Sequence, residues 1–206
     1  MSNKTVQPQT LSKKGLDTKT ALIRSGVELM TTYGYVSSNI ESILKKVDVP
    51  KGSFYYYFKS KEDFGRAIIT SYDDFFAHKL DKHLTNEALS SPLSRIVAFY
   101  EDAKQGMAKY NFNRGCLIGE MIQEESMLPE GYNLLLENIL QNWQNKIERC
   151  LLLAQQLGEI TANVDCKELA MFFWLGWEAA VTRSKLIKNS KPLDIFIKYY
   201  LGNIKK

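Results

Sequence analysis

The sequence has few of the residues that build metal centres and disulfide frameworks. It contains three cysteines, Cys116, Cys150 and Cys166, and two histidines, His78 and His83. The cysteines are odd in number, widely spaced and far from both histidines along the chain, and no Cys-x-x-Cys pair occurs. This pattern argues against a zinc site or a disulfide framework. It fits a reducing compartment, so we expect a cytoplasmic protein.

Long apolar stretches are also missing. No run reaches the ~20 residues that a transmembrane helix needs, and the first ten residues contain no apolar segment of the secretory type. We therefore expect neither membrane insertion nor export. A glycine-rich phosphate loop and a nucleophile elbow are absent too, so we expect no enzymatic activity, no cofactor and no metal.

The period-two alternation of an amphipathic strand does not occur, whereas apolar residues recur at helical spacing along most of the chain. The sequence therefore predicts an all-α protein of about nine helices. Ser38 with Glu41 and Ser60 with Asp63 match capping patterns, and Gly34 matches a helix end. These signals place helices at about 17–33, 38–47, from 50 onward, 60–84, 93–110, 116–125, 130–157, 165–187 and from 192 onward.

The most informative segment runs from Gly34 to Lys61 and predicts two short helices joined by a tight turn at Asp48. Phe54 and Phe58 are four residues apart and can face inward together. The side chains expected to point outward are those of Lys51, Tyr55, Tyr56 and Tyr57. Hydroxyl and ammonium groups there can meet phosphate oxygens and base edges, as the second helix of a helix-turn-helix must. The alternative is an ordinary helical hairpin within a bundle.

Charge is distributed unevenly along the chain. Residues 1–61 hold ten Lys/Arg and four Asp/Glu, whereas the remainder holds 17 and 19, within an overall net charge of +4. A basic N-terminal quarter on a slightly acidic body is typical of a DNA-reading domain attached to a separate core. A chance imbalance of this modest size is the alternative.

Residues 18–70 resemble the DNA-binding domain of the TetR family of bacterial repressors, without gaps. The matching residues are Gly34-Tyr35, Ser37-Ser38, Ile40, Ile43, Val49, Lys51-Gly52-Ser53-Phe54-Tyr55, Tyr57-Phe58 and Ser60-Lys61-Glu62. The resemblance implies an all-α homodimer with an N-terminal helix-turn-helix head and a ligand pocket in the C-terminal domain. It suggests a flexible basic arm at 1–16, a DNA-binding domain at 17–62 and a ligand-binding and dimerisation domain at 63–206.

The same resemblance assigns DNA-contacting roles by position. It gives phosphate contacts to the Ser37 and Ser38 hydroxyls and to Lys61, and the leading edge of the recognition helix to Lys51, Gly52 and Ser53. Tyr55 and Tyr56 match aromatic residues that contact backbone or bases. The chain departs from the family pattern with Asp48 in place of a turn glycine, Pro50 in place of serine and Tyr57 in place of histidine.

The C-terminal half is similar to the branch of the family that includes the N-ethylmaleimide-reductase repressor. The similarity lies in Gly115-Cys116-Leu117, Trp174-Leu175-Gly176 and Lys185, and it implies that Cys116 senses electrophiles, with Lys185 beside it. A thiol at a helix N-terminus next to Arg114 can have a lowered pKa. A buried, inert cysteine is the alternative.

Aromatic residues of the C-terminal half can line an effector pocket or form a dimer face. The candidate ligand residues are Cys116, Tyr100, Glu120, Trp143, Phe173, Trp177 and Lys185. Glu120 can equally be part of a solvated face. For the dimer, we expect the last two helices to pair with those of a second copy.

The function expected from these features is that of a ligand-responsive transcriptional repressor. It binds a palindromic double-stranded DNA operator and is released by a small molecule or an electrophile. Alternatively, a non-covalently bound small acid or hydrophobic ligand acts without a covalent sensor. Two other classes stay open here: an architectural DNA-binding protein without a ligand, and a thiol enzyme that uses Cys116 with a histidine base.

Overall fold

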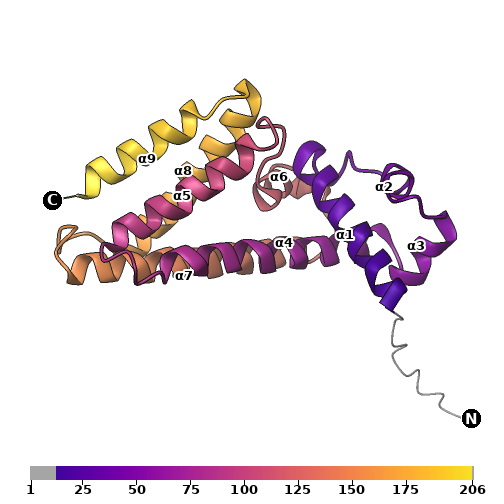
Figure 1. The fold of residues 1–206 in the computed structure, drawn as a ribbon, viewed down its shortest axis with the longest axis horizontal. Coiled ribbons are helices and arrows are strands. Elements are labelled where there is room, and N and C mark those ends of the chain that lie inside the picture. The colour runs from indigo at the N-terminus through magenta and orange to yellow at the C-terminus, as the bar shows by residue number, and fades with distance from the viewer. Residues whose placement is uncertain (1–12, 206) are drawn as a thin grey trace, which may run out of the picture.

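The computed structural model describes residues 13–205, which fold into nine α-helices and one short 3-10 helix (Figure 1). The helices are α1 (Lys13–Tyr33), α2 (Ile40–Val47), α3 (Lys51–Tyr57), α4 (Lys61–Leu84), α5 (Pro92–Ala108), α6 (Leu117–Gln123), η1 (Glu125–Met127), α7 (Tyr132–Gln156), α8 (Cys166–Ile187) and α9 (Lys191–Ile204). Within this range the only β pairing is a single bridge between Ile160 and Lys205. The all-α prediction is confirmed.

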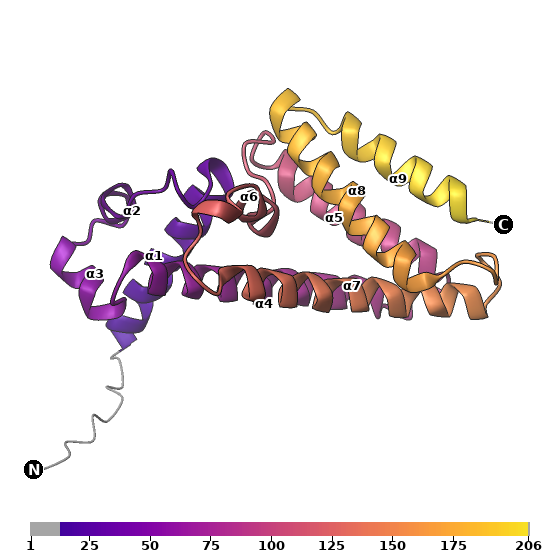
Figure 2. The same cartoon turned by 180° about the vertical axis from the view of Figure 1, so that it is seen from behind.

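The helices form a small head and a larger body. Helices α1, α2 and α3 make the head at one end of the molecule, and α4 leaves it to run beside α7 along one edge of the body (Figures 1 and 2). Helices α5, α8 and α9 form an inclined second layer, and α6 lies between that layer and the head. The body is therefore connected to the head by two elements, α4 and α6.

Local sequence signals explain most helix ends. The Ser60 side chain accepts a hydrogen bond from the Asp63 N–H at 3.0 Å, and Asp63 accepts one from the Lys59 N–H at 2.9 Å, so the predicted cap of α4 is confirmed. Gly34 ends α1 with a φ of 84°, in the left-handed region that suits glycine.

Two expected helix starts are wrong. Helix α2 is capped by Asn39, whose side chain accepts from the Ser42 N–H at 2.7 Å, and not by Ser38 with Glu41. Helix α1 begins at Lys13 rather than at Asp17, so residues 13–16 are helical. The rest of the expected flexible arm, 1–12, lies outside the described residues.

Large aromatic residues form the core of the body. Trp143, Phe99 and Phe173 are fully buried, and Trp143 packs against Trp174 with ring centroids 5.3 Å apart. These rings join α5, α7 and α8 and hold the two layers together. None of the helices in residues 13–205 combines the length and the apolar character needed to cross a membrane.

Candidate functional site

The outer face of α3 carries the side chains expected to read DNA. Phe54 and Phe58 are 0% and 2% exposed, because they pack into the head, whereas Tyr55 and Tyr56 are 55% and 59% exposed. Lys51 and Gly52 are also exposed, and Ser53 is half-buried. The helix therefore presents two phenol rings and an ammonium group to solvent.

The two serines before α2 differ in orientation. Ser37 is exposed, whereas Ser38 is 2% exposed and its hydroxyl donates a hydrogen bond to the Gly34 carbonyl at 2.6 Å. This buried hydroxyl closes the loop between α1 and α2. Ser37 is therefore the serine of the pair that is free to meet a phosphate.

Lys61 is held beside the same loop. Its Nζ atom donates to the Val36 carbonyl at 3.2 Å and lies 4.7 Å from the centre of the Tyr35 ring. Burial lowers the pKa of Lys61, and the nearby Glu124 carboxylate acts in the opposite direction. The ammonium group is thus positioned before any DNA arrives.

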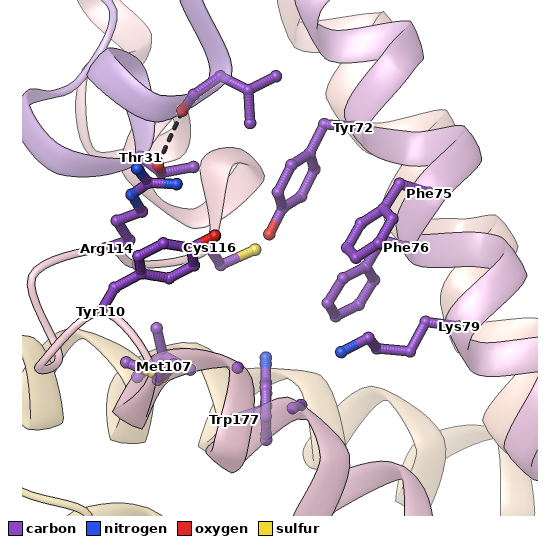
Figure 3. Close-up of a pocket in the computed structure, with 15 residues that line it drawn as sticks. Thr31, Tyr72, Phe75, Phe76, Lys79, Met107, Tyr110, Arg114, Cys116 and Trp177 are labelled. Carbon is purple, nitrogen blue, oxygen red and sulfur yellow. Dashed lines mark hydrogen bonds between the residues drawn. The ribbon is translucent and has the colours of Figure 1, made fainter. Parts of the chain in front are cut away.

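A cavity of about 260 Å³ lies where the body meets the head (Figure 3). Its walls come from α1, α4, α5, the loop before α6, and α8. The lining residues are Val27, Thr31, Tyr72, Phe75, Phe76, Lys79, Ala103, Gly106, Met107, Tyr110, Arg114, Gly115, Cys116, Trp177 and Val181. Because α1 supplies two of them, a molecule in this cavity would touch the DNA-binding head directly.

Cys116 lines the cavity, but its thiol is not activated. Burial raises the pKa of the Cys116 thiol to about 11, although N–H groups of α6 and the Tyr72 hydroxyl act in the opposite direction. Arg114 is occupied elsewhere, since its guanidinium pairs with Glu28 at 2.7 Å and lies 3.8 Å from the centre of the Tyr110 ring. The expectation of a lowered pKa beside Arg114 is therefore wrong.

Of the other expected ligand residues, only Trp177 lines the cavity. The Tyr100 hydroxyl donates to Asp194 at 2.6 Å, and the Trp143 indole N–H donates to Asp73 at 2.7 Å. Phe173 is 0% exposed in the aromatic core. These three rings therefore hold helices together.

Glu120 and Lys185 were expected near a ligand or a thiolate. The structure pairs them with each other instead, with Lys185 Nζ 2.7 Å from the Glu120 carboxylate and both side chains largely buried. The pair joins α6 to α8 next to the cavity wall.

The sequence reasoning missed the cavity residues of α4. The missed residues share one face of α4, because they follow the spacing i, i+3, i+4 and i+7. They are Tyr72, Phe75, Phe76 and Lys79. Lys79 shares this face with apolar residues, which is unusual. That pattern in the sequence could have identified the face as part of a ligand site.

Two sets of contacts join the cavity wall to the head. On one side, the Gly115 N–H donates to the Thr31 carbonyl at 2.9 Å, and Arg114 pairs with Glu28. Glu28 also forms an ion pair with Lys46 of α2. The loop before α6 is thereby connected to both α1 and α2.

On the other side, Glu124 follows the last turn of α6 and caps the loop after α1. Its carboxylate accepts hydrogen bonds from the Tyr35 N–H at 2.6 Å and the Val36 N–H at 3.2 Å. Glycine suits position 34 because its φ of 84° would strain other residues, and an added Cβ would also force this carboxylate to move. Helix α6 thus runs from the cavity, at Cys116, to the head, at Glu124.

Helices α8 and α9 keep an apolar face exposed. Its members, all between 47% and 60% exposed, are Met171, Phe172, Leu175, Ile195 and Tyr199. By contrast, Phe173, Trp174 and Tyr200 are buried within the protomer and are not available to a partner.

Comparison with known proteins identifies the family. Residues 22–68 match the model of bacterial regulatory proteins of the tetR family, and residues 92–200 match that of the tetracyclin repressor-like C-terminal domain. The transcriptional regulator AcuR of Cereibacter sphaeroides is 42% identical over 180 residues, covering 87% of this chain and 82% of that protein. The chain belongs to the TetR family.

Other members of the TetR family support this assignment. The repressor DhaR of Mycobacterium sp. is 28% identical, covering 85% of this chain and 86% of that protein. A crystal structure of a regulatory protein TetR from Rhodobacter sphaeroides superposes with a TM-score of 0.88 at 41% identity, covering 90% and 97% of the two chains. Reduced NemR of Escherichia coli shares the fold, with a TM-score of 0.78 at 24% identity, covering 92% and 98%.

TetR-family proteins are DNA-binding regulators of transcription that respond to ligands and bind operators as dimers. The chain is accordingly a transcriptional regulator and not an enzyme, which removes the thiol-enzyme alternative.

Proposed function

We propose that this protein is a repressor whose operator complex is dissociated by a small molecule bound in the cavity between α1, α4, α5 and α8. The observation that carries the proposal is the position of this cavity, which shares Val27 and Thr31 of α1 with the DNA-binding head. Because the protein acts on DNA, we place its activity in the cytoplasm. The proposed boundary between head and body lies after residue 62, and the head includes the whole of α1 from Lys13.

DNA contacts are assigned to the exposed side chains of the head. Tyr55 and Tyr56, with Lys51, Gly52 and Ser53, enter the major groove, while Ser37 and Lys61 bind the flanking phosphates. Lys51 has only an exposed ion pair with Glu41, at 3.1 Å, and such pairs are weak enough to be exchanged for a phosphate. Ser38 is left out because its hydroxyl is buried and bonded to Gly34.

Dimerisation is assigned to α8 and α9 through the exposed face of Met171, Phe172, Leu175, Ile195 and Tyr199. Two heads related by a twofold axis then read a palindrome whose half-sites are about one helical turn apart or slightly further.

The effector acts by preferring one of two arrangements of head and body. The ligand binds more tightly when α1 and α6 have shifted away from the DNA-binding geometry. The difference between its affinities for the two arrangements sets how far it lowers operator affinity. The buried, neutral Cys116 favours a non-covalent effector over electrophile sensing. A cavity with tryptophan and tyrosine walls also favours a ligand-responsive protein over an architectural one.

The function is tested by selecting duplexes from a random library and measuring their affinity at fixed salt. We expect a palindromic duplex to be bound at least about a thousandfold more tightly than a scrambled one, as for specific regulators. Equal affinity for both duplexes would reject sequence-specific regulation.

A further inference from the structure

A polar pocket of about 430 Å³ lies between the head and the body, beside the cavity described above. The head lines it with four residues of α1 and with Lys46 of α2, and the body lines it with the loop after α5. Tyr110 and Arg114 also line the cavity, so the two spaces share a wall. The polar pocket is nevertheless a different environment, because Leu29 is the only aliphatic residue among its described lining residues.

Positive charge dominates the polar pocket. Lys46, Lys109 and Arg114 line it together with a single carboxylate, that of Glu28, which gives a net charge of +2. Glu28 pairs with both Lys46 and the Arg114 guanidinium, the latter at 2.7 Å. Lys109 has no carboxylate partner among the described residues, and its ammonium group lies 5.7 Å from the centre of the Tyr110 ring. The pocket therefore holds more positive charge than its own carboxylate can neutralise.

Glu28 fixes the position of two of these cations. Its hydrogen bond with Lys46 and the charge of Arg114 lower the pKa of the Glu28 carboxyl, whereas burial acts in the opposite direction. Figure 3 shows the Arg114 guanidinium turned toward α1 rather than toward the middle of the cavity. Lys46 and Arg114 are thus held on one carboxylate before any ligand arrives, and their remaining N–H groups are available to an acceptor.

The loop that forms the body side of the polar pocket has an unusual backbone. Asn111 and Phe112 have φ angles of 51° and 54°, in the left-handed region that a phenylalanine rarely adopts. The loop is held by the Phe112 N–H, which donates to the Met107 carbonyl at 2.9 Å, and by Lys188, whose Nζ donates to the Phe112 carbonyl at 3.4 Å. Strained backbone of this kind is often found at ligand-binding sites.

This loop also offers hydrogen-bond donors to the polar pocket. The side chains of Asn111 and Asn113 line the pocket and are exposed, and neither forms a hydrogen bond with another described residue. Their amide groups and the Lys109 ammonium group come from the body, whereas Lys46 comes from the head. A ligand with several acceptor oxygens could therefore be bound from both sides.

We propose that the polar pocket binds a small organic phosphate monoester. At pH 7 such a group carries about −1.5 to −2 charges, which match the net charge of +2, whereas a single carboxylate would leave positive charge unmatched. Guanidinium and ammonium groups are the usual donors to phosphate oxygens. The inference concerns a site separate from the cavity and does not depend on which molecule binds there.

The size of the polar pocket favours an ester over a bare phosphate ion. Its volume lies within the range of small-molecule sites, so space remains once a phosphate group is bound. Leu29 and Tyr33 of α1 provide a less polar wall on the head side, and Tyr33 is 66% exposed. The organic part of the ligand lies against these two side chains, while the phosphate group meets the three cations.

Titration calorimetry at pH 7.5 and constant ionic strength tests this inference with three probes: phenyl phosphate, inorganic phosphate and phenol. Lys109→Met removes the cation that has no carboxylate partner. The matched control is Lys51→Met, because Lys51 is an exposed lysine on α3, outside the polar pocket, where a phosphate could bind to the DNA-reading face instead. Thermal unfolding confirms that each variant is folded.

We expect phenyl phosphate to bind the wild type at least about tenfold more tightly than either inorganic phosphate or phenol. Lys109→Met should weaken phenyl phosphate about fivefold or more, as expected for the loss of a partly exposed charge pair. Lys51→Met should stay within twofold of the wild type.

The inference is overturned if phenyl phosphate does not bind at millimolar concentration, if inorganic phosphate binds equally well, or if Lys51→Met loses as much affinity as Lys109→Met. The affinity of Lys109→Met for the selected duplex should equal that of the wild type, since a loss there would mean that the pocket holds a phosphate of the DNA. Absence of specific DNA binding by the wild type rejects the proposed function, whereas the calorimetry decides on the polar pocket by itself.

Discussion

At the scale of single residues, neighbours decide what the ionisable groups can do. Lys61 is preset by the Val36 carbonyl and the Tyr35 ring, so its ammonium group is ordered beside the head. Cys116 is kept neutral by burial, although it borders the cavity. The environment of Lys61 can be tested by the salt dependence of DNA binding, and that of Cys116 by its rate of alkylation.

Replacing Lys61 by Ala should weaken operator binding and reduce the salt dependence. Loss of one phosphate contact lowers the slope of log affinity against log salt by about one per protomer. Fluorescence anisotropy at several salt concentrations measures the slope, with Lys82→Ala, an exposed lysine near the other end of α4, as the control. An unchanged slope in a folded Lys61→Ala protein would exclude the phosphate contact.

Alkylation of Cys116 by N-ethylmaleimide should be slow at pH 7 and should accelerate about tenfold per pH unit up to pH 10. The thiolate is the reactive form, and below a pKa of about 11 its fraction grows with rising pH. Peptide mass spectrometry after timed pulses separates Cys116 from Cys150 and Cys166. Rapid labelling of Cys116 at pH 7 that does not depend on pH would support the covalent sensor instead.

At the scale of elements, α6 connects the cavity to the loop after α1. Cys116 at its start borders the cavity, and Glu124 beyond its end holds the loop after α1. A displacement of α6 by a ligand would therefore alter the loop that also positions Lys61.

Glu124→Ala should destabilise the protein by about 1 kcal/mol, because it leaves the Tyr35 and Val36 N–H groups without their carboxylate acceptor. Operator affinity should fall as well, since the loop that carries Ser37 becomes less ordered. Urea unfolding and anisotropy measure the two effects, with the exposed neighbour Glu125→Ala as the control. Equal behaviour of the two variants would show that Glu124 does not hold the loop.

The elements were largely predictable from sequence, whereas the cavity was not. Helix ends such as Gly34 and Ser60 follow from local capping chemistry, which a sequence displays. Trp174 and Trp177 lie three residues apart on α8, but only the packing of α4 and α5 against that helix decides which one reaches the cavity. The Cys116 environment likewise depends on burial between elements distant in sequence.

At the scale of the whole molecule, regulation depends on two heads acting together. The exposed apolar face of α8 and α9 lies at a distance from α3, so changes there should not affect the DNA-reading surface itself (Figure 1). Dimerisation and DNA contact are therefore separable by mutation.

Phe172→Glu should produce monomers at micromolar concentration, because a charge replaces a ring that is 54% exposed on this face. Operator affinity should drop sharply, since a monomer engages one half-site only. Light scattering gives the mass, and Leu134→Glu, at a 68% exposed position on α7, is the control. A Phe172→Glu protein that remains dimeric would place the interface elsewhere.

The most direct measurement is the affinity of wild type, Tyr56→Ala and Tyr33→Ala for the selected palindromic duplex. Both tyrosines are exposed, at 59% and 66%, but only Tyr56 lies on α3. We predict that Tyr56→Ala weakens specific binding about tenfold, whereas Tyr33→Ala stays close to wild type. Equal affinities of the two variants, or a wild type without preference for the palindrome, would contradict the assignment of α3 as the DNA-reading helix.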